Sequence, residues 1–491
     1  MSCRISSKQH PFMHFSKPRS ICTMYNPLST YSLILILFFF NTSILHGLNV
    51  DYSHSYLEQS RHNFKGANIH HMSTSDEPNE EWSYVQVRPK AHLFYWLYYT
   101  THQSGYKNRP LILWLQGGPG GSGTGFGNFE ELGPLDGNLK PRSTTWLQTA
   151  SLLFIDSPVG TGYSYAEDDS AFTTNVAEIS RDLLSLMKNF TTTYKDFQNI
   201  PFYIFSESYG GKMTADFSSV LYNEIQNGGI KMNFQGFAMG DSWISPVDST
   251  NSWGPFLYAT SIVDLAGMQS INAAAKKAED LVKQGKFEEA TEAWSLTEGV
   301  VSAESGGVNF YNILDWDGDA TLFSKSGKPD LRSPIDKLYN RHVRVMQNDD
   351  LDALMNGPIR KKLKVIPDKV TWGGQSGTVF EKQAGDFMKN VTSTVNNLVN
   401  NSTLKVIIYS GQLDLICDVL GTETWFYKYI DKSAPFQKQP KQNLKCGEQP
   451  GVCFYLKEYE NLKFFWVLDA GHMVPTDNGP GALAMVNNII K

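Results

Sequence analysis

Short apolar runs alternate with helical patterns between residues 82 and 240. The helical pattern is clearest from Val176 to Phe190, and Asn175 followed by Glu178 predicts a capping box at its start. Alternating strands and helices predict a mostly parallel sheet that is covered by helices on both faces. The runs with the character of buried strands are residues 92–99, 111–115, 152–155, 202–205 and 234–239.

The pattern changes after residue 240. Residues 241–370 have little strand character and contain two helical stretches, at 268–284 and 287–303, whereas strand-like runs return at 405–409 and 464–468. A helical block between two sheet-forming parts predicts an inserted cap. We therefore expect an α/β core made of residues 82–240 and 371–491, with ligands bound beyond the carboxyl ends of its strands.

The N-terminal region differs from the rest of the chain. Residues 1–30 are polar and basic, and an uncharged apolar run at residues 33–40 follows. This order predicts a leader, residues 1–47, that serves as a secretory signal peptide, with Met24 as an alternative start. The apolar run is short for a membrane span, so no stable membrane insertion is expected, although an uncleaved anchor is the alternative. Polar residues 48–81 predict a loose lead-in.

Further features of the sequence fit the secretory pathway. Cys446 and Cys453 lie in a loop where they can pair across a small hairpin, which leaves Cys417 as the odd thiol. We expect a secreted or lysosomal protein. Its four candidate glycosylation sites are Asn189, Asn390, Asn400 and Asn401.

The composition of the chain is that of a folded globular protein. The chain has 491 residues, of which 41% are hydrophobic and 19% are charged, as is ordinary for a globular protein. Its net charge of −6 gives no electrostatic case for binding nucleic acid. The 13% aromatic share suits a large core or an aromatic-lined cleft. No Cys/His set has the spacing of a zinc site, so neither a metal nor a cofactor is expected. Both a monomer and a homodimer stay open.

Ser208 lies where a predicted strand turns directly into a predicted helix. This is the context of a nucleophile elbow, in which the residues two positions before and after the serine must be small. Gly210 meets this requirement, and Ser206, in place of the usual glycine, is still small. The alternative is an ordinary strand-to-helix turn that is rich in small residues.

Asp414 and His472 follow two later strand-like runs, in the chain order that a triad on such an elbow requires. A serine hydroxyl needs a base, and the base needs a carboxylate that orients it. Taken singly, Asp414 also fits a helix cap and His472 a core histidine. Their shared position after strands favours a catalytic triad with Ser208, and with it a serine hydrolase of the α/β-hydrolase fold.

Five motifs follow one another along the chain, at Trp114–Gly121, Glu131–Pro134, Asp156–Tyr165, Glu207–Gly210 and Gly471–Pro475. In these motifs the sequence resembles the serine carboxypeptidases, the family of carboxypeptidase Y and lysosomal protective protein. Gln116 and the sequence around Ser208 are similar to the retinoid-inducible serine carboxypeptidase subgroup. The resemblance covers about residues 82–491.

The resemblance implies roles for individual residues. Ser208 would be the nucleophile, His472 the general base and acid, and Asp414 the group that orients the imidazole. The backbone N–H groups of Gly118 and Tyr209 would form the oxyanion hole. The residues that would hold the terminal carboxylate of the substrate are Gln116, Gly117, Glu131 and Glu207.

The sequence also departs from the family pattern. Gln116 replaces the usual asparagine, which adds a methylene to the carboxylate grip, and Gly121 replaces a cysteine, so that the disulfide of that loop is absent. The function implied is release of C-terminal amino acids from peptides, favoured at acid pH. An acyltransferase of the same family and a protective or binding protein with little turnover are the alternatives.

Overall fold

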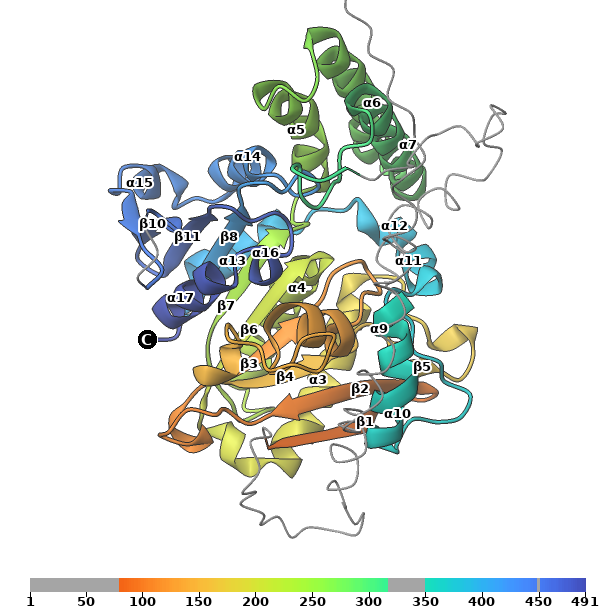
Figure 1. The fold of residues 1–491 in the computed structure, drawn as a ribbon, viewed down its shortest axis with the longest axis vertical. Helices are drawn as coiled ribbons and strands as arrows, with labels where there is room; N and C mark the ends of the chain where they lie inside the picture. Colours follow the sequence, from red (N-terminus) through yellow and green to blue (C-terminus); the bar gives the residue numbers. More distant parts are fainter. Residues whose placement is uncertain (1–78, 317–348, 448–450) are drawn as a thin grey trace, which may run out of the picture. The chain divides into compact units, whose positions relative to one another are not determined.

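The computed structural model describes residues 79–316, 349–447 and 451–491 (Figure 1). The predicted leader, residues 1–47, and most of the predicted lead-in lie outside these ranges. Among the helices within them, none combines the length and the apolar character that a membrane crossing would require.

An 11-stranded sheet forms the centre of the fold, in the order β1-β2-β4-β3-β6-β7-β8-β11-β10-β9, with β5 paired to β2. Six neighbouring strands, from β4 to β11 in that order, pair in parallel, as the alternation of strands and helices predicts. The strands are β1 Glu80–Arg88, β2 Ala91–Tyr98, β3 Leu111–Leu115, β4 Ser151–Ile155, β5 Tyr165–Ala166, β6 Pro201–Ser208, β7 Asn233–Ser242, β8 Lys405–Gly411, β9 Gln442–Leu444, β10 Phe454–Tyr459 and β11 Leu462–Val467.

The centre of the sheet is buried on both faces, and β3 shows why a central strand is apolar throughout. Side chains alternate between the two faces of a strand. Leu111, Leu113 and Leu115 belong to one core, whereas Ile112 and Trp114 belong to the other. A continuous apolar run is therefore what a parallel strand needs when helices cover both sides.

Helices on the two faces complete these cores (Figure 1). Residues of α3, α4, α13 and α14 fill the first core, and residues of α9, α10, α17 and the π-helical segment η2 fill the second. Their bounds are η2 Gly123–Leu132, α3 Val176–Thr193, α4 Tyr209–Gln226, α9 Asp349–Leu354, α10 Arg360–Leu363, α13 Thr392–Asn401, α14 Val419–Tyr429, α16 Val474–Asp477 and α17 Gly479–Ile489.

The described residues between β7 and β8 form helices that pack in two different places. The helices α5 Pro246–Ala259, α6 Leu265–Lys283 and α7 Phe287–Ser305 pack on one another. By contrast, α9 and α10 join the core on the sheet, where Trp82 Nε1 donates to the carbonyl of Leu363 at 2.9 Å. The short helices α11 Gly377–Lys382 and α12 Ala384–Phe387 precede α13.

The start of α3 differs from the predicted capping box. Asn175 Oδ1 accepts from the backbone N–H of Glu178 at 3.0 Å, as expected of an N-cap. The reciprocal bond is displaced by one residue, because Glu178 Oε2 accepts from the backbone N–H of Thr174 at 2.8 Å instead of that of Asn175. The backbone before the cap is thereby held by the side chain of Glu178.

Candidate active site

Ser208 ends β6 and directly precedes α4, at the carboxyl edge of the parallel sheet. Its φ of 61° and ψ of −129° are strained for a residue with a side chain, as at many functional sites. A Cβ on Gly210 would lie 2.2 Å from the carbonyl oxygen of Leu115, so only glycine fits there. Ser206 is accommodated because it is buried and its Oγ donates to the carbonyl of Ala238 at 3.3 Å.

Ser208 and His472 line the same cleft. Asp414 lies next to His472 and is not among the residues that line this cleft. Asp414 and His472 follow β8 and β11, which are parallel neighbours, so their loops leave the same edge of the sheet. His472 Nδ1 and Asp414 Oδ2 lie 3.0 Å apart, and both side chains are buried. Burial lowers the pKa of His472, which favours the neutral imidazole that a general base requires.

The loop after β3 lies directly against the nucleophile. A Cβ on Gly117 would lie 2.3 Å from Cβ and 2.9 Å from Oγ of Ser208, so the absence of a side chain lets this backbone approach. Gly118 lines the same cleft. Tyr209 is the first residue of α4, and N–H groups at a helix N-terminus favour negative charge. Both residues predicted for the oxyanion hole thus adjoin the nucleophile.

Glu131 and Glu207 form a buried pair of carboxyl groups, which we call the acid pair. Gln116 Nε2 donates to Oε1 of Glu131 at 2.9 Å and to Oε1 of Glu207 at 3.0 Å. Burial raises the pKa of both carboxyl groups, and the proximity of Glu131 raises that of Glu207 further. The second oxygens of both, Oε2 of Glu131 and Oε2 of Glu207, have no donor among the described residues, which favours protonation of the pair.

The side-chain amide of Gln116 donates hydrogen bonds to both members of the acid pair. Trp114 Nε1 donates to Gln116 Oε1 at 2.7 Å, and this bond fixes which end of the amide faces the two carboxyl groups. Gln116 and Glu207 line the cleft, whereas Glu131 lies behind them. The family resemblance implies a shared role for these residues, whereas the three hydrogen bonds that hold the amide of Gln116 are visible only in the structure.

Aromatic and aliphatic side chains line the same cleft as Gln116 and Glu207, and we call them the cleft wall. Trp243 follows β7, Trp294 is on α7, and Phe387 ends α12, with ring centroids of Trp294 and Phe387 4.7 Å apart. In the sequence, only the high share of aromatic residues indicates such a wall, and no local pattern identifies these positions. The remaining apolar members of the wall are Phe126, Tyr311, Phe380 and Ile416.

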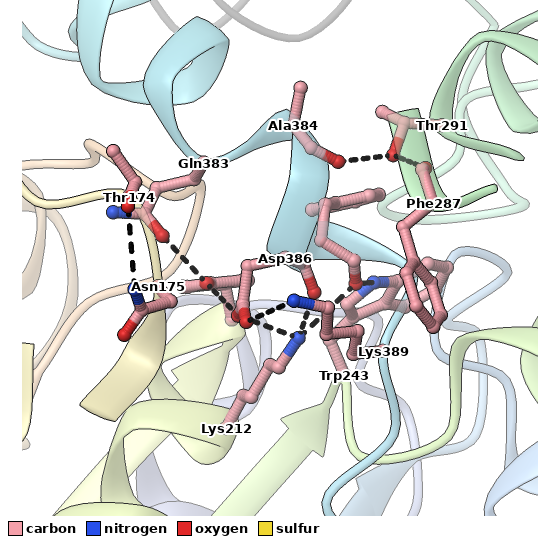
Figure 2. A network of polar contacts seen from close by, with 12 residues as sticks. Thr174, Asn175, Lys212, Trp243, Phe287, Thr291, Gln383, Ala384, Asp386 and Lys389 are labelled. Carbon is pink, nitrogen blue, oxygen red and sulfur yellow. Dashed lines mark hydrogen bonds and ion pairs between the residues drawn. The ribbon is translucent and has the colours of Figure 1, made fainter. Parts of the chain in front are cut away.

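A buried polar network connects the cleft wall to α4, the helix that directly follows Ser208 (Figure 2). Lys212 on α4 pairs with Asp386 on α12, with Nζ and Oδ2 3.0 Å apart, and Nζ also donates to the Asp386 carbonyl. The hydroxyl of Tyr209 donates to the same Oδ2 at 2.9 Å. Trp243 Nε1 donates to the carbonyl of Phe387 at 3.1 Å. The residue after the nucleophile and the cleft wall are therefore joined through one carboxylate.

Within the described residues, one group of three side chains of metal-binding type gathers within 4.8 Å, and its members are Asp414, Cys417 and His472. The bond between Asp414 and His472 already accounts for their proximity, so we assign this group to acid–base chemistry. Cys417 is a buried free thiol, while Cys446 and Cys453 form a disulfide beside β9 and β10. The four sequon residues Asn189, Asn390, Asn400 and Asn401 are exposed.

Comparison with known proteins gives consistent relatives. The family model described as serine carboxypeptidase matches residues 72–491. Retinoid-inducible serine carboxypeptidase of Mus musculus is 48% identical over 418 residues, which cover 84% of this chain and 92% of that protein. Serine carboxypeptidase-like 51 of Arabidopsis thaliana is 40% identical over 440 residues, which cover 87% of this chain and 95% of that protein.

Among solved structures, a prohormone-processing carboxypeptidase of Saccharomyces cerevisiae, Kex1(delta)p, shares the fold. The TM-score is 0.68 at 20% identity, and the match covers 84% of this chain and 91% of that chain. The predicted mostly parallel sheet with helices on both faces is thereby confirmed as a known arrangement.

Proposed function

Because this chain belongs to the serine carboxypeptidase family, we propose that it releases C-terminal amino acids from peptides through an acyl-enzyme on Ser208. The observation that carries the proposal is the acid pair beside the nucleophile elbow. A serine hydrolase of general kind needs the triad alone, whereas a proton shared by two buried glutamates suits a substrate that ends in a carboxylate.

In the first half of the reaction, Ser208 Oγ attacks the last peptide carbonyl while His472 Nε2 takes the hydroxyl proton. Asp414 holds the imidazole through Nδ1 and stabilises the imidazolium that forms. The N–H groups of Gly118 and Tyr209 would face the developing oxyanion. Collapse of the tetrahedral intermediate breaks the C–N bond, and His472 gives its proton to the leaving amine.

In the second half, water replaces the released amino acid. His472 takes a proton from this water as it attacks the acyl carbonyl, and Ser208 recovers its proton when the ester bond breaks. An alcohol or amine in place of water would give acyl transfer. None of the contacts on the described residues favours such an acceptor, so we propose hydrolysis.

The acid pair explains selection of the chain end and a preference for acid pH. A protonated Glu207 donates a hydrogen bond to the substrate carboxylate, whereas an ionised pair repels it. An internal peptide bond brings no carboxylate to this position. The apolar wall made by Trp243, Trp294 and Phe387 supports apolar side chains next to the scissile bond.

We also propose that the protein enters the secretory pathway, carries glycans and is secreted or delivered to lysosomes. The exposure of all four sequon residues and the disulfide between Cys446 and Cys453 support this route. An acidic compartment would suit the acid pair.

Product analysis on matched peptides tests the function. An N-blocked dipeptide with apolar side chains is incubated at acid pH, once with a free carboxylate and once as the C-terminal amide. We expect the free amino acid from the first peptide and far slower cleavage of the second, with Ser208→Ala inactive on both. Equal cleavage of both peptides would refute selection by the acid pair, and a transferred acyl group would indicate an acyltransferase.

A further inference from the structure

Asp241 is a buried acidic residue at the carboxyl end of β7, the strand between the one that carries Ser208 and the one that precedes Asp414. Its φ of 41° is strained for a residue with a side chain, which turns the backbone at this point. Asp241 Oδ1 accepts from the backbone N–H of Gly411 at 2.7 Å. The side chain therefore bridges from β7 to the end of β8, three residues before Asp414.

The carboxyl groups of Asp241 and Asp414 lie close enough for a hydrogen bond between them. One oxygen of each, Oδ2 of Asp241 and Oδ1 of Asp414, has no N–H or O–H donor among the described residues. Ionised carboxylates only accept hydrogen bonds, so two of them cannot bond without a proton between them. A proton held by the pair satisfies both oxygens at once.

The partners of the two groups show which of them holds the proton. Asp414 Oδ2 faces His472 Nδ1 at 3.0 Å and accepts from the backbone N–H of Cys417 at 3.3 Å, and both donors favour its ionised form. Burial raises the pKa of both groups well above the usual range of an aspartate. The contact between the acids lowers the pKa of Asp414 and raises that of Asp241. We therefore assign the proton to Asp241.

We propose that Asp241 is a further positioning residue, a neutral carboxylic acid that donates a hydrogen bond to Asp414 and so holds this carboxylate in line with His472. The inference rests on the proposed triad. The proton stays on Asp241 throughout the reaction, and only its loss at higher pH removes the donor. Ionisation would also bring a second negative charge beside the pair of Asp414 and His472.

The surroundings of Asp241 determine how it titrates. Burial and the negative charge of Asp414 oppose its ionisation and raise its pKa, whereas a protonated His472 and the N–H of Gly411 favour the ionised form. The groups that face it are Glu207 on β6, Tyr409 on β8, Asp414 and Cys417 in the loop after β8, and His472 after β11. Because burial and the charge of Asp414 both raise the pKa of Asp241, its neutral form should persist well above the range of an ordinary aspartate.

Two variants test the role of Asp241. In Asp241→Asn, an amide can still donate to Asp414 and accept from Gly411, but it cannot ionise. We expect this variant to retain most of the kcat at acid pH, and to move the alkaline fall of kcat to higher pH. In Asp241→Leu the donor is lost, and kcat should drop roughly 10- to 100-fold with little change in KM. An unchanged kcat in Asp241→Leu, or an alkaline limb that Asp241→Asn leaves in place, would overturn the proposal.

Further measurements distinguish failure of the role proposed for Asp241 from failure of the proposed function. If Asp241→Leu does not fold, as judged by circular dichroism, the pH profile of Asp241→Asn decides alone. Ser208→Ala and His472→Ala report on the triad itself. Activity that survives in these two variants would refute the proposed function, whereas their loss of activity beside a normal Asp241→Leu would refute only the role of Asp241.

Discussion

The ion pair between Lys212 and Asp386 offers a direct test of how the cleft wall is held (Figure 2). Asp386→Asn keeps the size of the side chain but removes the negative charge, which leaves the fully buried ammonium of Lys212 without its counter-charge. Breaking a buried pair in this way typically costs about 3–5 kcal/mol. We expect a loss of that size in the free energy of unfolding at pH 5.

The cost should depend on pH because Lys212 can lose its proton. Burial lowers the pKa of Lys212 to about 8 even with Asp386 present. Without the carboxylate the pKa falls further, so between the two pKa values the folded wild type binds one more proton than the folded variant. The difference in stability then shrinks by about 1.4 kcal/mol per pH unit as pH rises toward 8 and is constant above it.

Urea unfolding followed by tryptophan fluorescence at pH 5 and pH 8.5 measures both effects. The matched control is the double variant Lys212→Met, Asp386→Asn, in which no buried charge is left unpaired. We expect it to be more stable at pH 5 than Asp386→Asn alone, which is the coupling that a double-mutant cycle detects. A single variant within about 1 kcal/mol of wild type at pH 5 would refute the reasoning.

Three other predictions follow from the site and the loops around it. The raised pKa values of the acid pair keep it protonated at acid pH, so peptide KM should rise as pH rises through its titration, and a KM that is flat from acid to neutral pH would contradict this. Gly210→Ala would place a Cβ 2.2 Å from the carbonyl oxygen of Leu115 and should lower kcat/KM about 100-fold. The control Gly357→Ala, which has open space around the added Cβ, should leave kcat/KM unchanged. Equal activity of the two variants would count against a sterically fixed elbow. Replacing Cys446 and Cys453 with serine opens a loop of sequence separation 7 and should lower the free energy of unfolding by roughly 2–3 kcal/mol, and an unchanged denaturation midpoint would argue against a stabilising disulfide.

The parts of this fold that sequence could predict are those with a strong local signal. The apolar runs of β3, β4, β6, β7 and β8 fix a parallel sheet, because a strand buried on both faces must be apolar throughout. Strand ends then locate Ser208, Asp414 and His472, since parallel neighbours present their carboxyl ends at one edge. Residue order and strand position are therefore enough to predict which residues form a candidate triad.

Contacts between distant segments could not be predicted in the same way. Asp241 and Asp414 come from the ends of different strands. The sequence around Asp241 does not indicate that its neighbour in the fold is another carboxyl group. The bond from Trp114 to Gln116 depends on rotamers. Likewise, the helical character of α9 and α10 gives no hint that these helices pack on the sheet instead of with α5, α6 and α7.

The most direct test of the central claim is covalent labelling of the nucleophile. The protein is treated with a fluorophosphonate at acid to neutral pH, and the modified residue is located by peptide mass spectrometry. We predict one equivalent of label on Ser208, greatly slowed labelling in His472→Ala, and loss of peptide cleavage in proportion to labelling. Full labelling of another residue, or peptide cleavage that persists in fully labelled protein, would contradict a mechanism through Ser208.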